Sequence, residues 1–383
     1  MAEGRPAVLV INAGSSSLRA AVFGAIGGRA EATARPPLAR VHFEEQPTRP
    51  LFERALEELR SVAEDVEEGI EIVAVAHRVV HGGADREEPA VIDAAVLAEI
   101  ESLVPLAPLH QPHNLAGIRA AIACLPTALQ VACFDTAFHR TCPTTAQRFA
   151  IPTRLHDRGI RRYGFHGLSY ASIRAQLPAV VGGMPRRVIA AHLGAGASLC
   201  GLLDGRSVAT TMGFTPLDGL VMATRCGSLD PGVVIHLVAE GMDAATLTRL
   251  LYHESGLLGV SGSTGDMRTL LASDDPRARE AVDLFCHRAV REIGSMAAAL
   301  GGVDAIVFTA GIGERAPAVR RRIAAEFGWL GLSLDMEANA AATGGGPARI
   351  STAESKVMVW VIPTQEERTM LGYTLDVLAQ SAA

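Results

Sequence analysis

The chain has 383 residues, of which 49% are hydrophobic and 20% charged, and its formal net charge is -6. This length exceeds what one hydrophobic core usually supports, so two domains are expected, and the composition excludes a disordered chain. The absence of a basic bias argues against a nucleic-acid partner. No segment is typical of a signal peptide or a membrane span, and the six cysteines lack C-x-x-C spacing, so we expect a cytoplasmic protein with reduced thiols and no membrane contact.

The chain opens with two apolar runs around a turn rich in serine. Residues 7–11 and 18–23 are predicted to be strands of a hairpin, with Asn12 to Ser17 between them. The backbone N–H groups and hydroxyls of such a turn suit a phosphate, although a purely structural Ser/Gly turn is the alternative. Because a strand follows the glycine, this turn is not a phosphate loop of the Walker type.

Helices and strands alternate over the rest of the first half. Residues 50–68 have the apolar spacing of an amphipathic helix, 70–80 and 129–134 are predicted strands, and helices are predicted at about 93–104 and after Pro112. The second half then repeats the opening, with strand 188–193, the small-residue turn 194–198 and return strand 199–203. The repeat predicts two similar α/β domains, each presenting a phosphate-sized turn towards a shared cleft.

The remaining pattern contains a second glycine motif. Asp204-Gly205 predicts a primed hairpin turn before strand 206–211. Strand 305–309 leads into residues 311–313, predicted as a loop, and then helix 317–327; strand 356–362 precedes helix 365–378. The motif Gly311-x-Gly313-x-x-Ala316, with Asp335 downstream, also satisfies a dinucleotide fingerprint, so an NAD-dependent oxidoreductase is an alternative. Too few strands follow for a dinucleotide fold, which favours a mononucleotide.

Three arginines are candidates for anion binding. Arg78 lies inside an apolar run, where an unpaired guanidinium would be costly, so a carboxylate or phosphate partner is predicted for it. Arg225 and Arg268 lie in loop-like contexts, where solvation is the ordinary alternative.

Acidic residues follow two of the predicted strands. Asp135 comes directly after strand 129–134, and Glu366 and Glu367 come shortly after strand 356–362. Ligands bind at the carboxyl ends of parallel strands, and carboxylates there suit Mg²⁺. Complementing a helix dipole is the alternative for Glu366. His166, between two glycines, is a candidate ligand contact, whereas the pairs His77/His81 and His110/His113 lack a third zinc ligand.

These segments together resemble the acetate kinase family, within the acetate and sugar kinase/actin superfamily. The resemblance runs from Val8 to about Glu367 through ten collinear segments: VLVINAGSSSLR, AHRVVHGG, APLHQPHNL, FDTAFH, RRYGFHGLSY, AHLGAGAS, TMGFTPLDGLVMATR, SGLLGVSG, FTAGIGE and IPTQEE. It implies two similar actin-like (ribonuclease H-like) α/β domains around a nucleotide cleft. Their expected bounds are 1–145, with helix 367–383 packing back on this domain, and 146–366.

The activity implied by the resemblance is reversible transfer of the ATP γ-phosphoryl group to acetate, giving acetyl phosphate and ADP. Mg²⁺ or Mn²⁺ is the implied metal, ATP/ADP the co-substrate and a homodimer the assembly. A propionate kinase, another short-chain carboxylate kinase or a variant with a different phosphoryl donor is the alternative within this class. A nucleotide-binding regulatory module without turnover is the alternative from another class.

The resemblance also assigns roles to individual residues. The catalytic set is Arg78, Asp135, His166 and Arg225, of which Arg78 also holds the acceptor carboxylate. The metal ligands are Asn12 and Glu366. The acyl pocket is Val80, Leu109, Phe165 and Pro216. The nucleotide-binding set is Ser15, Ser17, Arg19, His192, Gly194, Gly196, Asp266, Arg268, Gly311, Ile312 and Gly313.

This sequence departs from the family pattern mainly on the nucleotide side. Arg19 stands where lysine is usual, and Ala195 and Arg315 each replace an asparagine. Cys226-Gly227-Ser228 replaces a Ser-Gly-Asp segment, and the residues after Glu367 lack the usual continuation. These changes bear on the phosphoryl donor and the rate more than on the class of reaction.

Overall fold

The computed structural model describes residues 5–13, 18–25, 28–45, 48–66, 69–108 and 110–381. The chain divides into two compact units. The first unit comprises Met1–Arg140, Gly167–Ser172 and Gln365–Ala383, and the second comprises Thr141–His166 and Ile173–Thr364. The domain bounds expected from the sequence (1–145, 146–366 and 367–383) stay a prediction, and the compact units interleave along the chain more than those bounds do.

The first unit is built on a six-stranded sheet of order β3-β2-β1-β4-β6-β5. Strands β1 and β2 form the predicted antiparallel hairpin, whereas β4 runs parallel to β1 and β6 parallel to β4. The carboxyl ends of β1, β4 and β6 therefore lie at one edge of the sheet. The bounds are β1 Arg5–Ala13, β2 Leu18–Gly24, β3 Ala39–Phe43, β4 Ile70–Val79, β5 Ala90–Val91 and β6 Leu129–Phe134.

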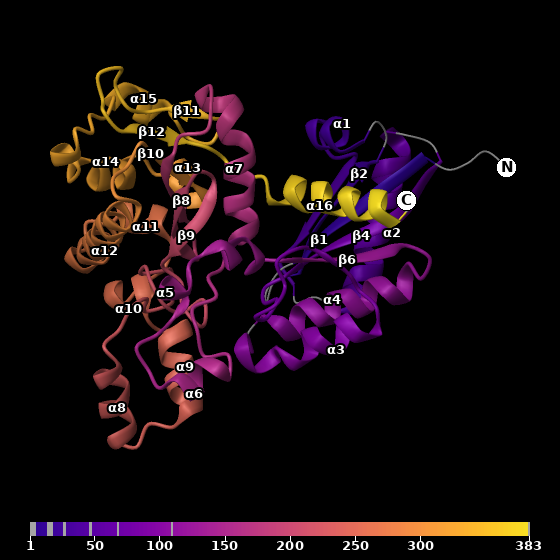
Figure 1. The fold of residues 1–383 in the computed structure, drawn as a ribbon, viewed down its shortest axis with the longest axis horizontal. Coiled ribbons are helices and arrows are strands. Elements are labelled where there is room, and N and C mark those ends of the chain that lie inside the picture. The colour runs from indigo at the N-terminus through magenta and orange to yellow at the C-terminus, as the bar shows by residue number, and fades with distance from the viewer. Residues whose placement is uncertain are drawn as a thin grey trace. The chain divides into compact units, whose positions relative to one another are not determined.

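Helices cover both faces of this sheet, because successive side chains of a strand point to opposite sides. Leu9 and Ile11 of β1 belong to a core with helices α2 (Arg49–Val66) and α4 (Gln111–Cys124). Val8 and Val10 belong to another core with α16 (Glu366–Ser381), the last helix of the chain. Figure 1 shows α16, in yellow, beside the indigo strands of the chain's beginning.

The second unit contains a sheet of order β11-β12-β10-β7-β8-β9. Strands β7, β8 and β9 form an antiparallel meander, and β10 and β12 are parallel to β7. Read from β9, the order repeats that of the first unit from β3, which confirms the predicted structural repeat. The bounds are β7 Arg187–Leu193, β8 Ala197–Leu203, β9 Arg206–Thr210, β10 Ala305–Thr309, β11 Ala348–Arg349 and β12 Met358–Val361.

The primed turn predicted at Asp204-Gly205 is confirmed, since both residues have positive φ, 49° and 75°. The loop predicted at residues 311–313 is wrong, because these residues lie in helix α13 (Ala310–Arg315). The helices between residues 231 and 300 were not predicted, among them the 25-residue α12 (Pro276–Leu300), which packs on β7, β8 and β9.

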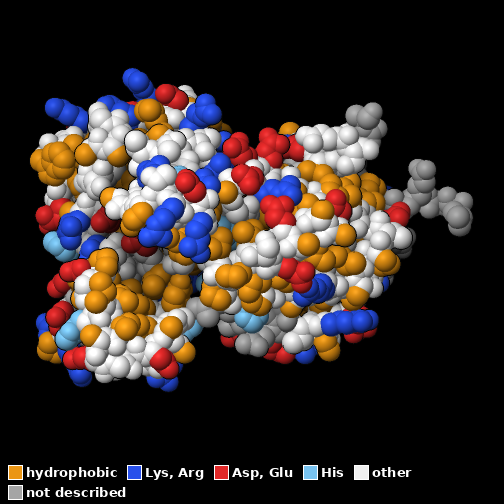
Figure 2. All heavy atoms as spheres, turned by 60° about the horizontal axis from the view of Figure 1, so that its bottom comes forward, with side chains coloured by type: hydrophobic (Ala, Val, Ile, Leu, Met, Phe, Trp, Pro, Cys, Tyr) orange, Lys and Arg blue, Asp and Glu red, His pale blue; other side chains and the backbone are white. Residues whose placement is uncertain are grey.

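The other helices are mostly short. They are α1 Gly28–Ala34, α3 Ala94–Ser102, η1 Val104–Leu106, η2 Ala137–Thr141, α5 Thr144–Gln147, α6 Thr153–Asp157, α7 Gly167–Val181, α8 Pro231–Ala239, α9 Ala244–His253, α10 Gly256–Ser261, α11 Met267–Leu271, α14 Pro317–Ala325, η3 Gly328–Leu330 and α15 Met336–Ala341. Within the described ranges, no helix has both the length and the apolarity needed to cross a membrane. Figure 2 shows acidic and basic side chains interspersed over the face that it draws.

Candidate active site

The first group of candidate residues lies at the carboxyl ends of β1, β4 and β6. Arg78, near the end of β4, donates from Nε and Nη2 to Oδ2 of Asp135 at 3.0 and 2.6 Å. Its Nη1 donates to Oδ1 of Asn12, near the end of β1, at 3.2 Å. The anionic partner predicted for Arg78 is therefore confirmed as a carboxylate.

Backbone contacts fix the position of Asp135. The residue is 1% exposed, and its N–H donates to the carbonyl of Val79 at 2.9 Å. Its own carbonyl accepts from the N–H of Gly167 at 2.9 Å. A Cβ at Gly167 would collide with this carbonyl, so the close approach requires glycine. Asp135 is consequently a buried carboxylate on a rigid support.

Charge compensation explains why a guanidinium is stable at this position. Burial disfavours the Arg78 cation, but attraction to Asp135 and Glu366 outweighs it and raises the pKa of Arg78. Glu366, the first residue of α16, is thus electrostatically part of this cluster. The cluster contains two carboxylates and one arginine, so it can still attract a cation.

The predicted acyl-pocket residue Val80 directly follows β4 and is 5% exposed. Two amide side chains from one face of α4 hold this segment. Asn114 accepts from the Val80 N–H at 3.0 Å and donates to the Ala13 carbonyl at 2.8 Å. Gln111 exchanges bonds with the backbone of His81, at 3.3 and 3.0 Å. The sequence reasoning missed Gln111 and Asn114, although both stand inside the quoted segment APLHQPHNL.

The second group of candidates lies in the second unit, around the β7–β8 hairpin. His166 has a left-handed backbone (φ 59°) just before α7. Its Nδ1 lies 2.9 Å from the hydroxyl of Ser198, and its ring stacks on His192 with centroids 4.0 Å apart. Ser198 was not predicted as a site residue, but its hydroxyl fixes the orientation of the imidazole.

The turn of this hairpin brings Arg225 close to His166. A Cβ at Gly196 would lie 3.3 Å from Nε2 of His166 and 3.8 Å from Nη1 of Arg225. Nη1 of Arg225 also donates to the carbonyl of Pro216, the predicted acyl-pocket residue, at 3.1 Å. Phe165, from the same predicted pocket, is 1% exposed. An imidazole and a guanidinium therefore flank a glycine turn, an arrangement that suits an anion.

A cavity of about 790 Å³ adjoins this turn within the second unit. This volume suits a small-molecule ligand such as a nucleotide. Residues of the predicted nucleotide set line it: Gly194, Asp266, Arg268, Gly311 and Ile312. Its other walls include Ala316 of the predicted glycine motif, and also Ala223, Gly265, Met267, Leu271 and Pro317, to which the sequence reasoning gave no role.

Two of the chain's departures from the family pattern also line this cavity. Ala195 presents a methyl group, and Arg315 adds a second arginine beside Arg268. Asp266 caps α11, where its Oδ1 accepts from the N–H and hydroxyl of Thr269, both at 2.8 Å. The hydrogen bond from the Thr269 N–H is the main reason that the pKa of Asp266 is lowered, and Nε of Arg268 lies 4.0 Å from this carboxylate.

The other predicted residues are placed as follows. Arg19 pairs with Asn12 across the β1–β2 hairpin, and its Nε lies 3.4 Å from His42. His192 is 9% exposed at the end of β7, and Gly313 packs against Phe308 of β10. Ser15, Ser17 and Leu109 lie outside the described residues.

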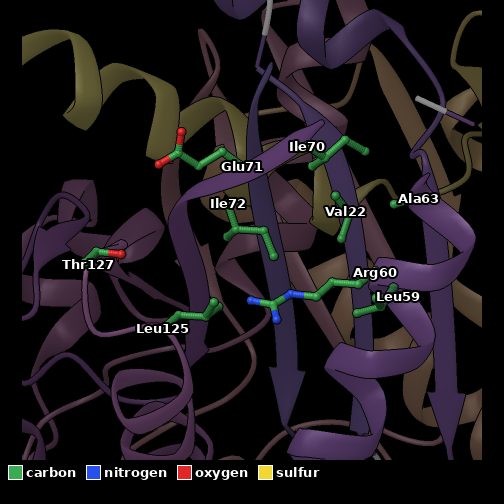
Figure 3. Close-up of a pocket in the computed structure, with 9 residues that line it drawn as sticks. All are labelled: Val22, Leu59, Arg60, Ala63, Ile70, Glu71, Ile72, Leu125 and Thr127. Atoms are coloured by element: carbon green, nitrogen blue, oxygen red, sulfur yellow. The ribbon is translucent and has the colours of Figure 1, made fainter. Parts of the chain in front are cut away.

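A separate cavity of about 310 Å³ lies in the first unit and contains none of the predicted site residues. It is formed by α2, β2, β4 and the segment before β6, and its walls are mostly aliphatic. Figure 3 shows Arg60 reaching from α2 toward its centre, while Glu71 points away.

Known proteins share this fold over nearly its whole length. An acetate kinase structure from Porphyromonas gingivalis is 35% identical, with a TM-score of 0.85, covering 97% of this chain and 100% of that one. A propionate kinase structure from Francisella tularensis subsp. tularensis SCHU S4 is 33% identical, with a TM-score of 0.86 and coverage of 96% and 98%. The chain thus has the fold of the carboxylate kinases, which confirms the predicted actin-like architecture.

Sequence similarity defines the family. Residues 7–371 match the acetokinase family. An acetate kinase from Rhodopseudomonas palustris (strain TIE-1) is 54% identical over 297 residues, which is 77% of this chain and 74% of that protein. The chain belongs to the acetokinase family, a family of phosphotransferases with a carboxylate as acceptor.

Proposed function

We propose that the protein transfers the γ-phosphoryl group of ATP reversibly to acetate. A carboxylate oxygen of acetate forms a bond to the γ-phosphorus, the bond from that phosphorus to the bridging oxygen breaks, and ADP leaves with the electron pair. Acetate is ionised at neutral pH because its pKa resembles that of a side-chain carboxyl, about 4. The reaction therefore needs no general base, and catalysis consists of positioning and charge neutralisation.

The observation that carries this proposal is the meeting of Arg78, Asp135 and Asn12 at the ends of three adjacent parallel strands. A half-buried guanidinium held by a buried carboxylate is a preorganised site for a carboxylate ligand. Arg78 binds and orients the acetate in this proposal. Val80, just beyond the end of β4, limits the size of the acyl group.

Arg225 and His166 neutralise the phosphoryl group as it transfers. Both side chains lie beside Gly196, which has no side chain of its own to separate them from the backbone of the turn. The charge of a transferring phosphoryl group spreads over its three equatorial oxygens, and an arginine there contributes a large rate factor. The stacking of His166 on His192 limits rotation of the ring.

The donor set in the first unit fits Mg²⁺ or Mn²⁺. Asn12 and Glu366 are the proposed ligands, with the carboxylate of Asp135 nearby, and all three offer the oxygen donors that such hard cations prefer. When bound, the metal would neutralise phosphate charge. Replacing Glu366 by Gln should raise the Mg²⁺ concentration needed for half-maximal activity.

The 790 Å³ cavity is the proposed adenosine site. Its glycines (Gly194, Gly265 and Gly311) let a sugar or phosphate approach the backbone, and Ile312, Met267 and Leu271 offer apolar surface to a base. Arg268 and Arg315 supply positive charge near the phosphates.

Acetate and propionate are the two acceptors to distinguish, because a propionate kinase shares this fold at a TM-score of 0.86. Purified protein should be tested for acyl phosphate formation by trapping with hydroxylamine, using acetate, propionate and butyrate with MgATP. GTP and pyrophosphate replace ATP in parallel. We expect acetate with ATP to give the highest kcat/KM. No acyl phosphate with any acceptor and donor would refute the proposal.

We further propose a cytoplasmic homodimer. Helix α8 and Leu229, two residues before it, expose aliphatic side chains: Ile235 is 69%, Val238 53%, and Val233 and Leu229 each 40% exposed. Clustered exposed aliphatic groups are typical of a subunit interface. All six cysteines carry free thiols, in keeping with a reducing compartment. Light scattering of the wild type and of Ile235→Asp would test the dimer.

A further inference from the structure

A fully buried arginine lies behind the proposed adenosine site. Arg320 of α14 is 0% exposed, and its guanidinium donates five hydrogen bonds. Nε donates to Oδ1 of Asn339 at 2.9 Å, and Nη2 donates to the carbonyls of Asn339 and Ala342, both at 2.7 Å. Nη1 donates to the carbonyls of Gly313 and Glu314 at 2.8 and 2.9 Å. Arginine has five N–H groups, so all are used.

The carbonyls that Arg320 binds are those at the carboxyl ends of short helices. Gly313 and Glu314 belong to the last turn of α13, and Asn339 and Ala342 to the end of α15. Carbonyls in a last helical turn have no partner within the helix, and a cation there is favourable. Arg320 therefore fastens the end of α13 to the end of α15.

Glu314 holds the other end of α13. Its Oε1 accepts from the N–H of Ala310 at 2.8 Å and from the N–H of Thr364 at 3.2 Å. Ala310 has a φ of 65°, in the left-handed region that a non-glycine residue occupies only at an energetic cost. Such a conformation persists when its surroundings hold it, and the Glu314 carboxylate does so directly.

Between these two attachments, α13 forms a wall of the 790 Å³ cavity. Gly311, Ile312 and Arg315 line the cavity, whereas neither Glu314 nor Arg320 does. We propose that Glu314 and Arg320 are positioning residues for nucleotide binding. They fix α13 from behind and so set the affinity for ATP without touching it. This inference rests on the proposed function of the cavity.

The test compares substitutions at both residues in the full-length protein. Arg320→Met removes all five donors, and Arg320→Lys keeps the charge with at most three. Glu314→Ala removes the acceptor, and Glu314→Gln keeps a carbonyl oxygen. We expect Arg320→Met and Glu314→Ala to raise KM for ATP by about 10-fold or more, since small displacements of positioning groups have effects of this size. Arg320→Lys and Glu314→Gln should recover part of this loss.

If Glu314 and Arg320 position the nucleotide site, their substitution should affect ATP binding and leave acetate binding almost unchanged. KM for acetate should stay within about 2-fold of wild type, and the rise in melting temperature caused by ATP should shrink in the same variants. Arg321→Met is the matched control, because Arg321 is exposed on the same helix. If Arg320→Met does not fold, Arg320→Lys and Glu314→Ala decide the question.

Two results would overturn the inference. One is an equal rise of KM for ATP and acetate, and the other is a lower melting temperature with KM for ATP unchanged, which a merely structural role would give. Failure of the proposed function can be distinguished from failure of this inference. If wild-type protein binds ATP but forms no acetyl phosphate, the reaction is wrong and the ATP-dependent melting shift still tests α13. If it binds no ATP, both proposals fail.

Discussion

Arg78 and Arg320 are both held in the interior by hydrogen bonds, but their surroundings differ in charge. Arg78 meets the carboxylates of Asp135 and Glu366, and its pKa is raised. Within the described part of the chain Arg320 meets only carbonyl and amide oxygens, and burial lowers its pKa to about 10. Arg78 remains partly open at the ends of the strands, with 22% of its side chain exposed, whereas Arg320 is closed off.

The difference separates two uses of a buried cation. A guanidinium that retains exposure and a carboxylate on one side can exchange partners with an incoming anion. A guanidinium whose five donors are all taken by the protein can only hold the backbone in place. The first arrangement suits a residue that contacts substrate, and the second suits a residue that positions another element.

The largest expected effect is on turnover. Arg78→Ala and Arg225→Ala should each lower kcat by about 10³-fold or more, because arginines that neutralise a transferring phosphoryl group contribute that much. Arg40→Ala is a matched control, since Arg40 bonds Glu367 at 2.7 Å with 58% of its side chain exposed. Initial rates of acetyl phosphate formation measure the effect. Near-wild-type turnover in either variant would remove that arginine from the mechanism.

His77, the neighbour of Arg78 in β4, extends the comparison to a group buried without charge. Burial lowers the pKa of His77 to about 4, while its bond to Gln130 works in the opposite direction. In the unfolded chain His77 takes up a proton as the pH falls below its ordinary pKa of 6.5. In the folded protein His77 stays neutral until about pH 4. The free energy of unfolding should therefore fall as the pH drops through this window, by about 3 kcal/mol for His77.

Urea denaturation at pH 7, 6, 5 and 4 measures this loss. His81, whose pKa burial also lowers to about 4, contributes in the same direction. His77→Gln should flatten the dependence without abolishing it, whereas His236→Gln, at a side chain that is 69% exposed, should not change it. An unchanged slope in His77→Gln would show that His77 is not buried neutral.

A double-mutant cycle tests the charge difference between the two arginines. Arg78→Met leaves the buried carboxylate of Asp135 without its cation, which is strongly destabilising. Adding Asp135→Asn removes that charge, so the double variant should regain about 2 kcal/mol of unfolding free energy. Among the described residues Arg320 has no carboxylate partner, so no such rescue is expected for it. Additive losses for Arg78 and Asp135 would show that the pair is not coupled.

The smallest expected effect concerns acyl size. Val80→Ala should enlarge the pocket and raise kcat/KM for propionate relative to acetate by about 4-fold, since one buried methylene contributes about 0.8 kcal/mol. Val79→Ala, one residue earlier in β4, is the control for loss of packing. Equal slowing of both substrates in Val80→Ala would place Val80 outside the acyl site.

Much of this architecture could be predicted because local patterns agree with it. The two hairpins, the primed turn and the partner of Arg78 followed from apolar runs, turn residues and the cost of a buried charge. Helix α13 could not, because its two glycines and left-handed Ala310 disfavour a helix locally, and Glu314 and Arg320 hold it through tertiary bonds.

The spacing of apolar residues also predicts two features that the sequence analysis did not include. Arg320 lies at helical spacing from the buried residues Ile323, Ala324 and Phe327. This spacing in the sequence predicts that Arg320 lies on the inner face of α14. The buried positions of α12 show the same spacing, from Ala278 through Phe285 to Ile293. The walls of the cavity could not be predicted from local patterns, because Gly194, Asp266 and Gly311 come from separate segments that only the fold brings together.

The position of α16 has a consequence for how the protein is made. Met370, Leu371 and Val377 of this helix complete a core with Val8 and Val10 of the first strand. During synthesis β1 emerges more than 350 residues before α16, so the face of the sheet that α16 covers stays exposed until that helix has been made. The residues of the second unit all precede Gln365, so this unit can fold before α16 is made. On the ribosome, the first unit therefore begins to form before the second unit and is completed after it.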